Sequence, residues 1–385
     1  MSRNEELRAR GSRVLPRGNS RASIYVPPSP PYAVRGEGAF VVDADGRRLI
    51  DCNNNYTSLI HGHAHHRVVS AAIEAIEHGT GFGLPTEGEI ALAELLTRRF
   101  GRPMQWRFAN SGSEAVMMAM RAARAHTGRD LVVRISGAYH GTYDQVVEEG
   151  EPGVPEPVRH ETICVAHDDE AAVVEAFRRH GERTAAVLVD LMPNRAGLRP
   201  ASTSFVETLR REAAAAGALV VVDEVITYRL GPAGLQSTYG LDADLTVLAK
   251  IIGGGFPVGA VGGRADVMAC FDPERPHPIH WGGTFSANPV TMAAGAAALE
   301  LYDAAAIEGL NARGDALRGE LEDAGVEVAG RGSLLRLFAD DFDKAWWELY
   351  GKGVLASANG LMALSTVMTE EDLGQVRAAV RAVLA

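Results

Sequence analysis

The sequence contains little cysteine, only Cys52, Cys164 and Cys270 in a chain of 385 residues. The number is odd, the three residues lie far apart, and no CxxC pair is present. This pattern supports neither a disulfide framework nor a zinc ribbon. A reducing compartment, and hence a cytoplasmic location, is the simplest expectation.

Long apolar runs and excess positive charge are also missing. No stretch of about 18 apolar residues occurs, so no membrane span is expected. Residues 1–21 carry many arginines but lack the apolar core of a secretory signal. Lys and Arg number 38 against 49 Asp and Glu, which leaves a net charge of −11. This balance disfavours nucleic acid or an anionic membrane as the main partner.

Hydrophobic residues make up 46% of the chain, enough for a large core. Segments in which they recur with the spacing of a helix take turns along the chain with short apolar segments typical of strands. The pattern predicts helices at 67–78, 87–99, 112–126, 170–180, 203–216 and 290–304. It predicts strands at 106–109, 131–135, 161–165, 186–190, 218–222 and 245–248, after a hairpin at 39–50 that turns at Asp45-Gly46. Such alternation favours an α/β fold with a mostly parallel sheet between helices, followed by a smaller α/β lobe.

Two predicted strands end on residues that could act together. Asp223 follows the apolar run 218–222, and Lys250 follows the run 245–249. Parallel strands present their carboxyl ends at one edge of a sheet, where ligands bind. An amine and a carboxylate there suit pyridoxal 5'-phosphate (PLP): lysine forms a Schiff base, and the acid keeps the pyridine nitrogen protonated. The alternative is an ordinary helix N-cap and a surface lysine.

A strand-to-helix turn carries Ser111, Gly112 and Ser113, whose backbone N–H groups and hydroxyls could bind a phosphate. An ordinary helix N-cap is the alternative. Tyr139 and His140 follow the strand 131–135, where an aromatic ring could stack on a flat ligand.

Two further segments contain candidate side chains. Thr284 offers a hydroxyl among glycines ahead of a helix. The histidines at 61, 63, 65 and 66 have no acid or cysteine at ligand spacing, so no metal site is predicted.

In combination these motifs resemble the class III aminotransferases, which are PLP enzymes of fold type I. The resemblance is closest to the branch of glutamate-1-semialdehyde aminomutase and the β-amino-acid aminotransferases. The matching stretches span most of the chain: 18–21, 43–46, 110–115, 137–143, 222–228, 248–263 and 282–289.

The resemblance implies a role for each candidate in the ring pocket. Lys250 would be the Schiff-base lysine and Asp223 the partner of the pyridine nitrogen. Val225 would pack on one face of the ring and Tyr139 on the other, with His140 among the cofactor-binding residues.

The resemblance also implies the remaining contacts. Ser111, Gly112 and Ser113 would hold the phosphate. Thr284 would reach the phosphate of a neighbouring subunit, which implies a homodimer with shared sites. Arg21 matches the position where this branch holds a substrate carboxylate; the alternative is one more arginine of an Arg-rich tail.

By the same resemblance, residues 1–60 would join the small lobe and the dimer interface. Residues 61–290 would form the large PLP-binding domain, and residues 291–385 the small C-terminal domain. The substrates would be small amino and keto acids.

Two departures from the branch bear on function. The segment 353–362 matches one in which aminomutases carry a glutamate, and it contains no acid. Asp190 and Leu191 stand where a Glu-Pro pair is commoner. The predicted function is therefore a PLP-dependent aminotransferase acting on a β- or ω-amino acid. The alternatives are a glutamate-1-semialdehyde aminomutase and a non-catalytic protein of the same fold.

Overall fold

The computed structural model describes residues 2–148 and 150–385. It divides into two compact units, Ser70–Ile307 and a second made of Met1–Val69 with Glu308–Ala385. The domain boundaries predicted at residues 60 and 290 stay predictions, and each unit is described by itself.

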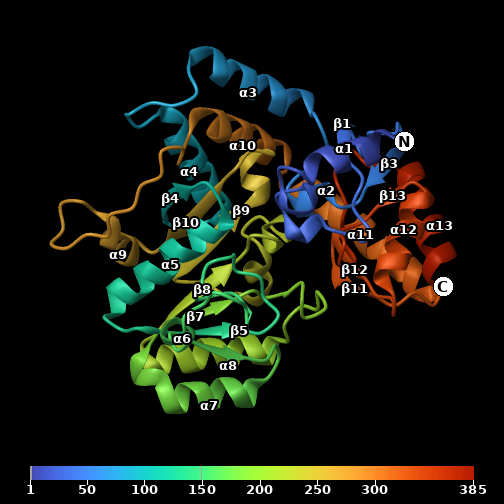
Figure 1. Cartoon of the computed structure of the whole chain (residues 1–385). Coiled ribbons are helices and arrows are strands. Elements are labelled where there is room, and N and C mark those ends of the chain that lie inside the picture. The colour runs from blue at the N-terminus through green and yellow to red at the C-terminus, as the bar shows by residue number, and fades with distance from the viewer. Residues whose placement is uncertain (1, 149) are drawn as a thin grey trace. The chain divides into compact units, whose positions relative to one another are not determined.

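The larger unit is built on a seven-stranded sheet in the order β4-β10-β9-β8-β7-β5-β6 (Figure 1). The strands are β4 (Gln105–Ala109), β5 (Leu131–Ile135), β6 (Thr162–Val165), β7 (Thr184–Val189), β8 (Leu219–Asp223), β9 (Leu245–Ala249) and β10 (Gly259–Gly263). Only β10 runs antiparallel to its neighbours. Every residue of β5, β7, β8 and β9 is buried, as expected for apolar strands covered on both faces.

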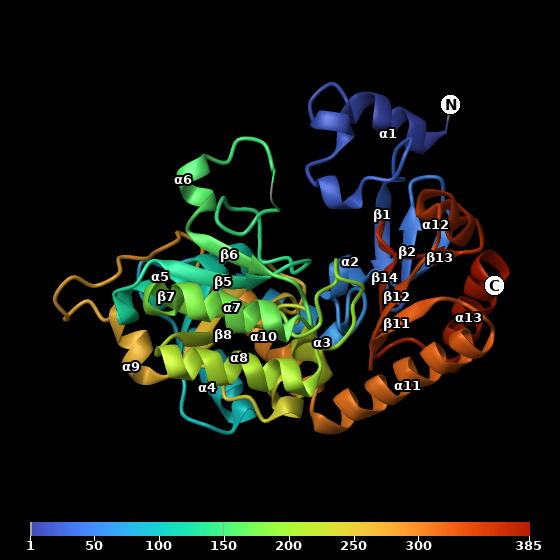
Figure 2. The same cartoon turned by 90° about the horizontal axis from the view of Figure 1, so that it is seen from below.

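Residues 66–301 form the helices α3 (His66–His78), α4 (Glu87–Phe100), α5 (Gly112–Thr127), α6 (Glu156–Arg159), α7 (Glu170–His180), α8 (Thr203–Ala216), α9 (Ala265–Met268) and α10 (Pro289–Leu301). Of these, α4, α5, α7, α8 and α9 contact strands of the sheet. The small side chains of α5 pack against alternate residues of the strands, including Ala186, Leu188 and Val221. Helix α8 contacts β7 and β8, and α7 runs beside it (Figure 2).

Local sequence signals explain where the main helices begin and end. Ser111 and Ser202 accept hydrogen bonds from the backbones of Glu114 and Phe205, which caps the starts of α5 and α8. Gly128 and Gly217 end the same helices in the left-handed conformation, which glycine adopts without steric cost.

The smaller unit contains two sheets, one formed by both ends of the chain and the other by C-terminal strands alone. One has the order β1-β2-β3-β13 and the other β11-β12-β14. Their strands are β1 (Ala33–Glu37), β2 (Phe40–Asp43), β3 (Arg48–Asp51), β11 (Val328–Arg331), β12 (Leu334–Leu337), β13 (Val354–Leu355) and β14 (Leu361–Ala363). The helices are α1 (Arg3–Gly11), α2 (Asn54–Thr57), α11 (Ala304–Asp323), α12 (Phe342–Gly351) and α13 (Glu370–Leu384).

The fold class predicted from the sequence is confirmed, and the predicted helices and strands lie within a few residues of the observed ones. The elements of the C-terminal lobe were not predicted individually, and several earlier ones were missed, strand β10 and helix α1 among them. Strand β10 reads Gly-Ala-Val-Gly-Gly and lacks the branched residues typical of strands. Helix α1 lies in a polar segment with little apolar periodicity; it begins with a capping box formed by Ser2 and Glu5.

Among the described residues, no single helix is both long and apolar enough to cross a membrane. Two consecutive helices, Pro289–Leu301 and Ala304–Asp323, are together long and apolar enough to span a membrane, but they are bent by 72° where they meet.

Candidate active site

Asp223 is the last residue of β8 and is only 5% exposed. Nδ1 of His140 lies 2.7 Å from its Oδ2, and the N–H of Val225 donates to its Oδ1 at 3.0 Å. A carboxylate can only accept, so an ionised Asp223 receives the Nδ1 proton of His140. These bonds satisfy both oxygens of a carboxylate that is shielded from water.

Lys250 directly follows β9, the strand beside β8 (Figure 1). Its backbone is left-handed, with φ of 54°, a conformation that costs free energy in a lysine and is concentrated at functional sites. Burial lowers the pKa of its amine, while the charges of Asp223 and Asp190 act in the opposite direction. The lysine therefore loses its proton more readily than one on the surface.

The Ser-Gly-Ser turn lies at the N-terminus of α5. The hydroxyl of Ser111 caps the helix, as the alternative interpretation expected. The hydroxyl of Ser113 has no hydrogen-bond partner among residues 2–148 and 150–385. A Cβ added to Gly112 would lie 3.3 Å from a methyl of Val225, and one added to Gly259 only 1.9 Å from the Ser111 carbonyl oxygen. Glycine thus lets β10 and the Asp223 segment approach this helix end closely.

The segment after β5 reaches the same helix end. A Cβ added to Gly141 would lie 2.5 Å from Oγ of Ser113, so this glycine packs directly on the turn. Tyr139 is 45% exposed, and the guanidinium carbon of Arg195 lies 4.8 Å from the centroid of its ring. The contact of the Arg195 guanidinium with the ring of Tyr139 was not expected from the sequence.

The residues fit a phosphorylated aromatic ring. A partly buried amine, a buried carboxylate and the N-terminus of α5, capped by Ser111, occupy neighbouring elements of one unit. His140, only 1% exposed, has no partner for its Nε2 among the described residues, and its Nδ1 faces Asp223. The structure therefore brings together Lys250, Asp223, Val225, His140, Tyr139, Ser111, Gly112 and Ser113.

Thr284 lies in the loop before α10 and is exposed. A Cβ added to Gly283 would lie 2.7 Å from Oγ of Ser286 and 3.1 Å from Nδ2 of Asn110. The loop thus runs beside the residue that precedes the Ser-Gly-Ser turn. Within the part of the chain that the structure describes, the Thr284 side chain makes no hydrogen bond.

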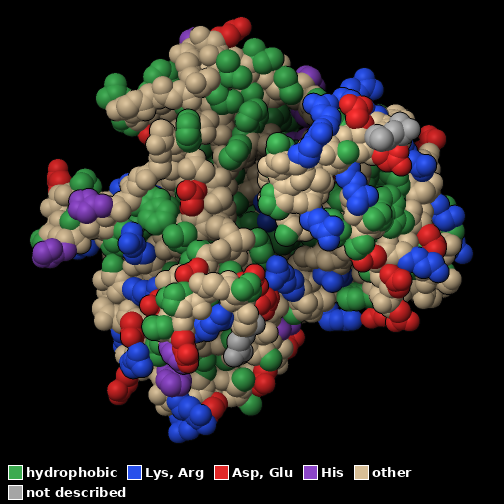
Figure 3. Space-filling model, viewed as in Figure 1, with side chains coloured by type: hydrophobic (Ala, Val, Ile, Leu, Met, Phe, Trp, Pro, Cys, Tyr) green, Lys and Arg blue, Asp and Glu red, His purple; other side chains and the backbone are tan. Residues whose placement is uncertain are grey.

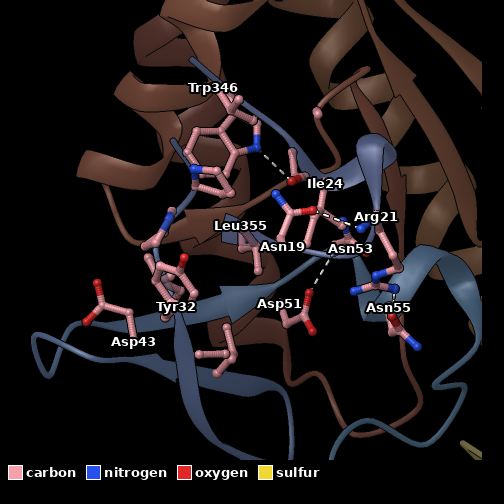
Figure 4. A pocket seen from close by; sticks show the side chains of 18 of the residues that line it. Asn19, Arg21, Ile24, Tyr32, Asp43, Asp51, Asn53, Asn55, Trp346 and Leu355 are labelled. Atoms are coloured by element: carbon pink, nitrogen blue, oxygen red, sulfur yellow. Dashed lines mark hydrogen bonds between the residues drawn. The ribbon is translucent and has the colours of Figure 1, made fainter. Parts of the chain in front are cut away.

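Arg21 belongs to the smaller unit and lines a pocket of about 370 Å³ there (Figure 4). Its Nη1 donates to Oδ1 of Asn55 at 2.8 Å. The wall is mostly apolar and includes Ile24, Trp346 and Leu355. Residues Asn54 to Thr57 have four consecutive positive φ values, between 48° and 72°, so strained backbone presents Asn55 to the arginine.

Asp190 was noted in the sequence only as a departure from a family pattern. The structure places it directly after β7, beside the end of β8, with 6% of its surface exposed. Burial, followed by the charge of Asp223, raises its pKa to about 7. Its position after an apolar run was the available signal, but the pairing of the strands was needed to place it beside Asp223.

Glu224 was missed for a similar reason. It is fully buried and accepts hydrogen bonds from the hydroxyl of Thr227 and the N–H groups of Leu235 and Gln236. These bonds tie together the loop that follows Asp223. Burial outweighs them and raises the pKa of Glu224 to about 7.

The histidine cluster has other partners. Nε2 of His63 lies 2.7 Å from Oδ2 of Asp51, and Nδ1 of His61 lies 2.8 Å from Oγ1 of Thr366. No group of three or more His, Cys, Asp or Glu that could hold a metal ion occurs in the described ranges.

Comparison with known proteins gives consistent results along the chain. Residues 25–371 match the model of the family described as aminotransferase class-III. The glutamate-1-semialdehyde 2,1-aminomutase of Thermomicrobium roseum is 44% identical over 293 residues, 73% of this chain and 68% of that protein. The β-phenylalanine transaminase of Variovorax paradoxus is 38% identical over 96% of this chain and 89% of its own length.

Solved structures are similar over the whole chain. An omega-transaminase from Sphaerobacter thermophilus has 40% identity and a TM-score of 0.95, covering 100% of this chain and 97% of its own. A transaminase with PLP bound has 39% identity and a TM-score of 0.95, covering 100% and 98%.

The pKa of Glu224 predicts a pH-dependent stability. A carboxyl whose pKa is higher in the folded state contributes stability below its unfolded pKa and loses it as pH rises through the folded pKa. Between about pH 4.5 and pH 7 the protein should lose about 3 kcal/mol of folding free energy through this residue. The Glu224→Gln variant has weakened hydrogen bonds at every pH. Because glutamine does not ionise, the variant should not lose this folding free energy as the pH rises.

Thermal melts at pH 5 and pH 8.5 check this prediction. The gap in melting temperature between the wild type and Glu224→Gln should narrow at the higher pH. Glu207→Gln, an exposed position on α8, serves as the control and should show no such change. An equal gap at both pH values would show that Glu224 stays ionised in the folded protein.

Proposed function

The chain belongs to the class-III aminotransferases, a family of PLP-dependent enzymes, and we propose that it moves an amino group from a small β- or ω-amino acid or amine to a keto acid. The observation that carries the proposal is the position of Lys250 and Asp223. Lys250 follows β9 and Asp223 ends the neighbouring strand β8, on the same unit as the Ser-Gly-Ser turn at the N-terminus of α5.

Each residue has a defined task in this proposal. PLP, when bound, supplies an aldehyde for the amine and a ring that withdraws electrons from the substrate carbon. Asp223 holds the proton of the ring nitrogen, and His140 donates to Asp223 and fixes its orientation. Ser111, Gly112, Ser113 and the dipole of α5 hold the phosphate. Val225 and Tyr139 confine the faces of the ring.

Lys250 has two tasks in the proposal. Its Nζ attaches the cofactor in the resting enzyme. Nζ of Lys250, when not bound to the cofactor, would take or give a proton at the substrate carbon. A base needs to be deprotonated near neutral pH, and the lowered pKa of Lys250 supports that role.

Arg21 supports a substrate with a carboxylate. A guanidinium can hold a carboxylate by two parallel hydrogen bonds. The apolar wall of its pocket would accommodate a hydrophobic substituent, and two relatives, the omega-transaminase and the β-phenylalanine transaminase, are named for amines not α to a carboxylate.

An aminomutase is the second candidate, because the Thermomicrobium relative carries that name. Such an enzyme keeps its substrate bound through the whole cycle. Residues 353–362, where aminomutases of this branch carry a glutamate, contain no acid in this chain, which favours the aminotransferase.

We include a cytoplasmic homodimer in the proposal. Figure 3 shows hydrophobic side chains gathered over α3 and nearby segments. The exposed ones in this part of the chain include Ile73, Ile76, Phe82, Leu84 and Ile90. A patch of this kind suits contact with a second copy. The free thiols of all three cysteines are compatible with a reducing compartment.

Borohydride treatment tests the assignment of Lys250. Reduction of the PLP-loaded protein should fix the cofactor mass on the peptide that contains Lys250. Lys250→Ala should bind PLP through the phosphate contacts but lose turnover and covalent labelling. A label on any other lysine, or none in loaded protein, would contradict the assignment.

Kinetics with paired substrates test Arg21. Arg21→Ala should raise KM about 10- to 100-fold for donors that carry a carboxylate, because a hydrogen bond between charged groups contributes about 1.5–3 kcal/mol. Amines without the acid should be unaffected. Arg17→Ala removes another arginine of the same pocket and is the matched control. An equal loss for both kinds of donor would make Arg21 structural, and acceptor-free isomerisation of glutamate-1-semialdehyde would favour the mutase.

Hybrid dimers test whether Thr284 serves the partner's phosphate. Thr284→Ala should weaken PLP binding about 10- to 100-fold through loss of one charge-assisted hydrogen bond. If the contact crosses between subunits, mixing this variant with Lys250→Ala creates one intact site in each hybrid, so activity should return. If Thr284 serves the turn of its own chain, the hybrids stay as weak as their parents. Thr284→Ser, which keeps the hydroxyl, is the control.

A further inference from the structure

Asp190 and Asp223 form a pair of neighbouring buried acids. The parallel strands β7 and β8 pair Val187 with Val220 and Val189 with Val222. Continued by one residue, this register sets Asp190 beside Asp223. Side chains at paired positions of parallel strands point to the same face, so both carboxyls leave the sheet together.

The two carboxyls differ in the number of hydrogen bonds that they accept. Asp223 accepts from His140 and from the N–H of Val225. Asp190, equally buried, accepts one hydrogen bond among the described residues, from the N–H of Met192 at 2.9 Å. Two adjacent buried carboxyls do not both ionise easily, and the less supported one keeps its proton longer. By this geometry the proton belongs to Asp190.

The charged groups around Asp190 agree with this assignment. Burial and the charge of Asp223 raise the pKa of Asp190 to about 7, while His140 and Lys250 act in the opposite direction. Glu224 is the remaining acid that interacts with it, and the charge of Asp190 raises the pKa of Glu224. Asp190 thus changes charge in the range where enzymes of neutral pH work.

We propose that Asp190 is a positioning residue that acts through Asp223, by setting whether one or two negative charges stand at the ends of β7 and β8. With Asp190 neutral, Asp223 is the single anion beside Lys250. With Asp190 ionised, the second negative charge favours a proton on Lys250 and on the ring nitrogen that Asp223 faces. The inference rests on the proposed function.

The local sequence suits this task. Leu191 replaces the proline that is commoner after the acid in this branch, and Asp190 is one methylene shorter than the usual glutamate. The shorter side chain keeps the carboxyl close to the strand end, where the N–H of Met192 reaches it. Asp190→Glu restores the commoner residue and retains the charge.

The first measurement is a pH titration of the visible absorption of the PLP-loaded protein. Because Asp190→Asn removes the second negative charge, the midpoint should fall by about one pH unit relative to the wild type. Asp190→Glu should return it toward the wild-type value. Asp130→Asn changes the net charge equally at an exposed position and should leave the midpoint unchanged.

The second measurement needs no cofactor. In cofactor-free protein at pH 8.5, the melting temperatures of Asp190→Asn, Asp223→Asn and the double variant should be non-additive, because either single change relieves the same repulsion. At pH 5.5, with Asp190 protonated, the coupling should shrink.

Two outcomes overturn the proposal: an unchanged absorption midpoint in Asp190→Asn, even with lower activity at every pH, or additive melting temperatures at pH 8.5. Failure of the proposed function gives a different result, a wild type that loads no PLP on Lys250. The melting experiment tests the coupling of the two acids in that case too.

Discussion

The candidate site depends on the hydrogen bonds that hold one carboxylate inside the protein. Asp223 is nearly inaccessible to water, and a polar group buried there needs hydrogen bonds from the protein in place of those from solvent. The imidazole of His140 and the N–H of Val225 offset the loss of solvent. The position of each is set in turn: His140 by the turn after β5, and Val225 by the loop that Glu224 holds. Strand order, loop conformation and side-chain protonation are therefore linked through Asp223.

Much of this arrangement could be predicted from the sequence, because it follows from local patterns. Apolar runs that end in Asp223 and before Lys250 locate two strand ends, and the general geometry of parallel sheets brings strand ends to one edge. In the Ser-Gly-Ser turn, the capping residue Ser111 is enough to predict the start of a helix. Resemblance to a family then assigned roles to these residues and added Val225 and Arg21, which no local pattern had singled out.

What could not be predicted depends on pairing between distant segments. Asp190 lies beside Asp223 only because β7 and β8 are neighbours in a certain register, which no local pattern states. Strand β10 has too many glycines to look like a strand, although those glycines allow the close approach to Ser111. The contact of Arg195 with Tyr139 joins two loops whose conformations depend on the whole unit.

The smaller unit is assembled from both ends of the chain, and this has a consequence for synthesis on the ribosome. Ile50 in β3 pairs with Val354 in β13, so β3 lacks this neighbour until almost the whole protein has been made. The larger unit consists of one continuous segment and is complete much earlier. During translation this edge of β3 remains unpaired, and an unpaired strand edge can associate with other chains.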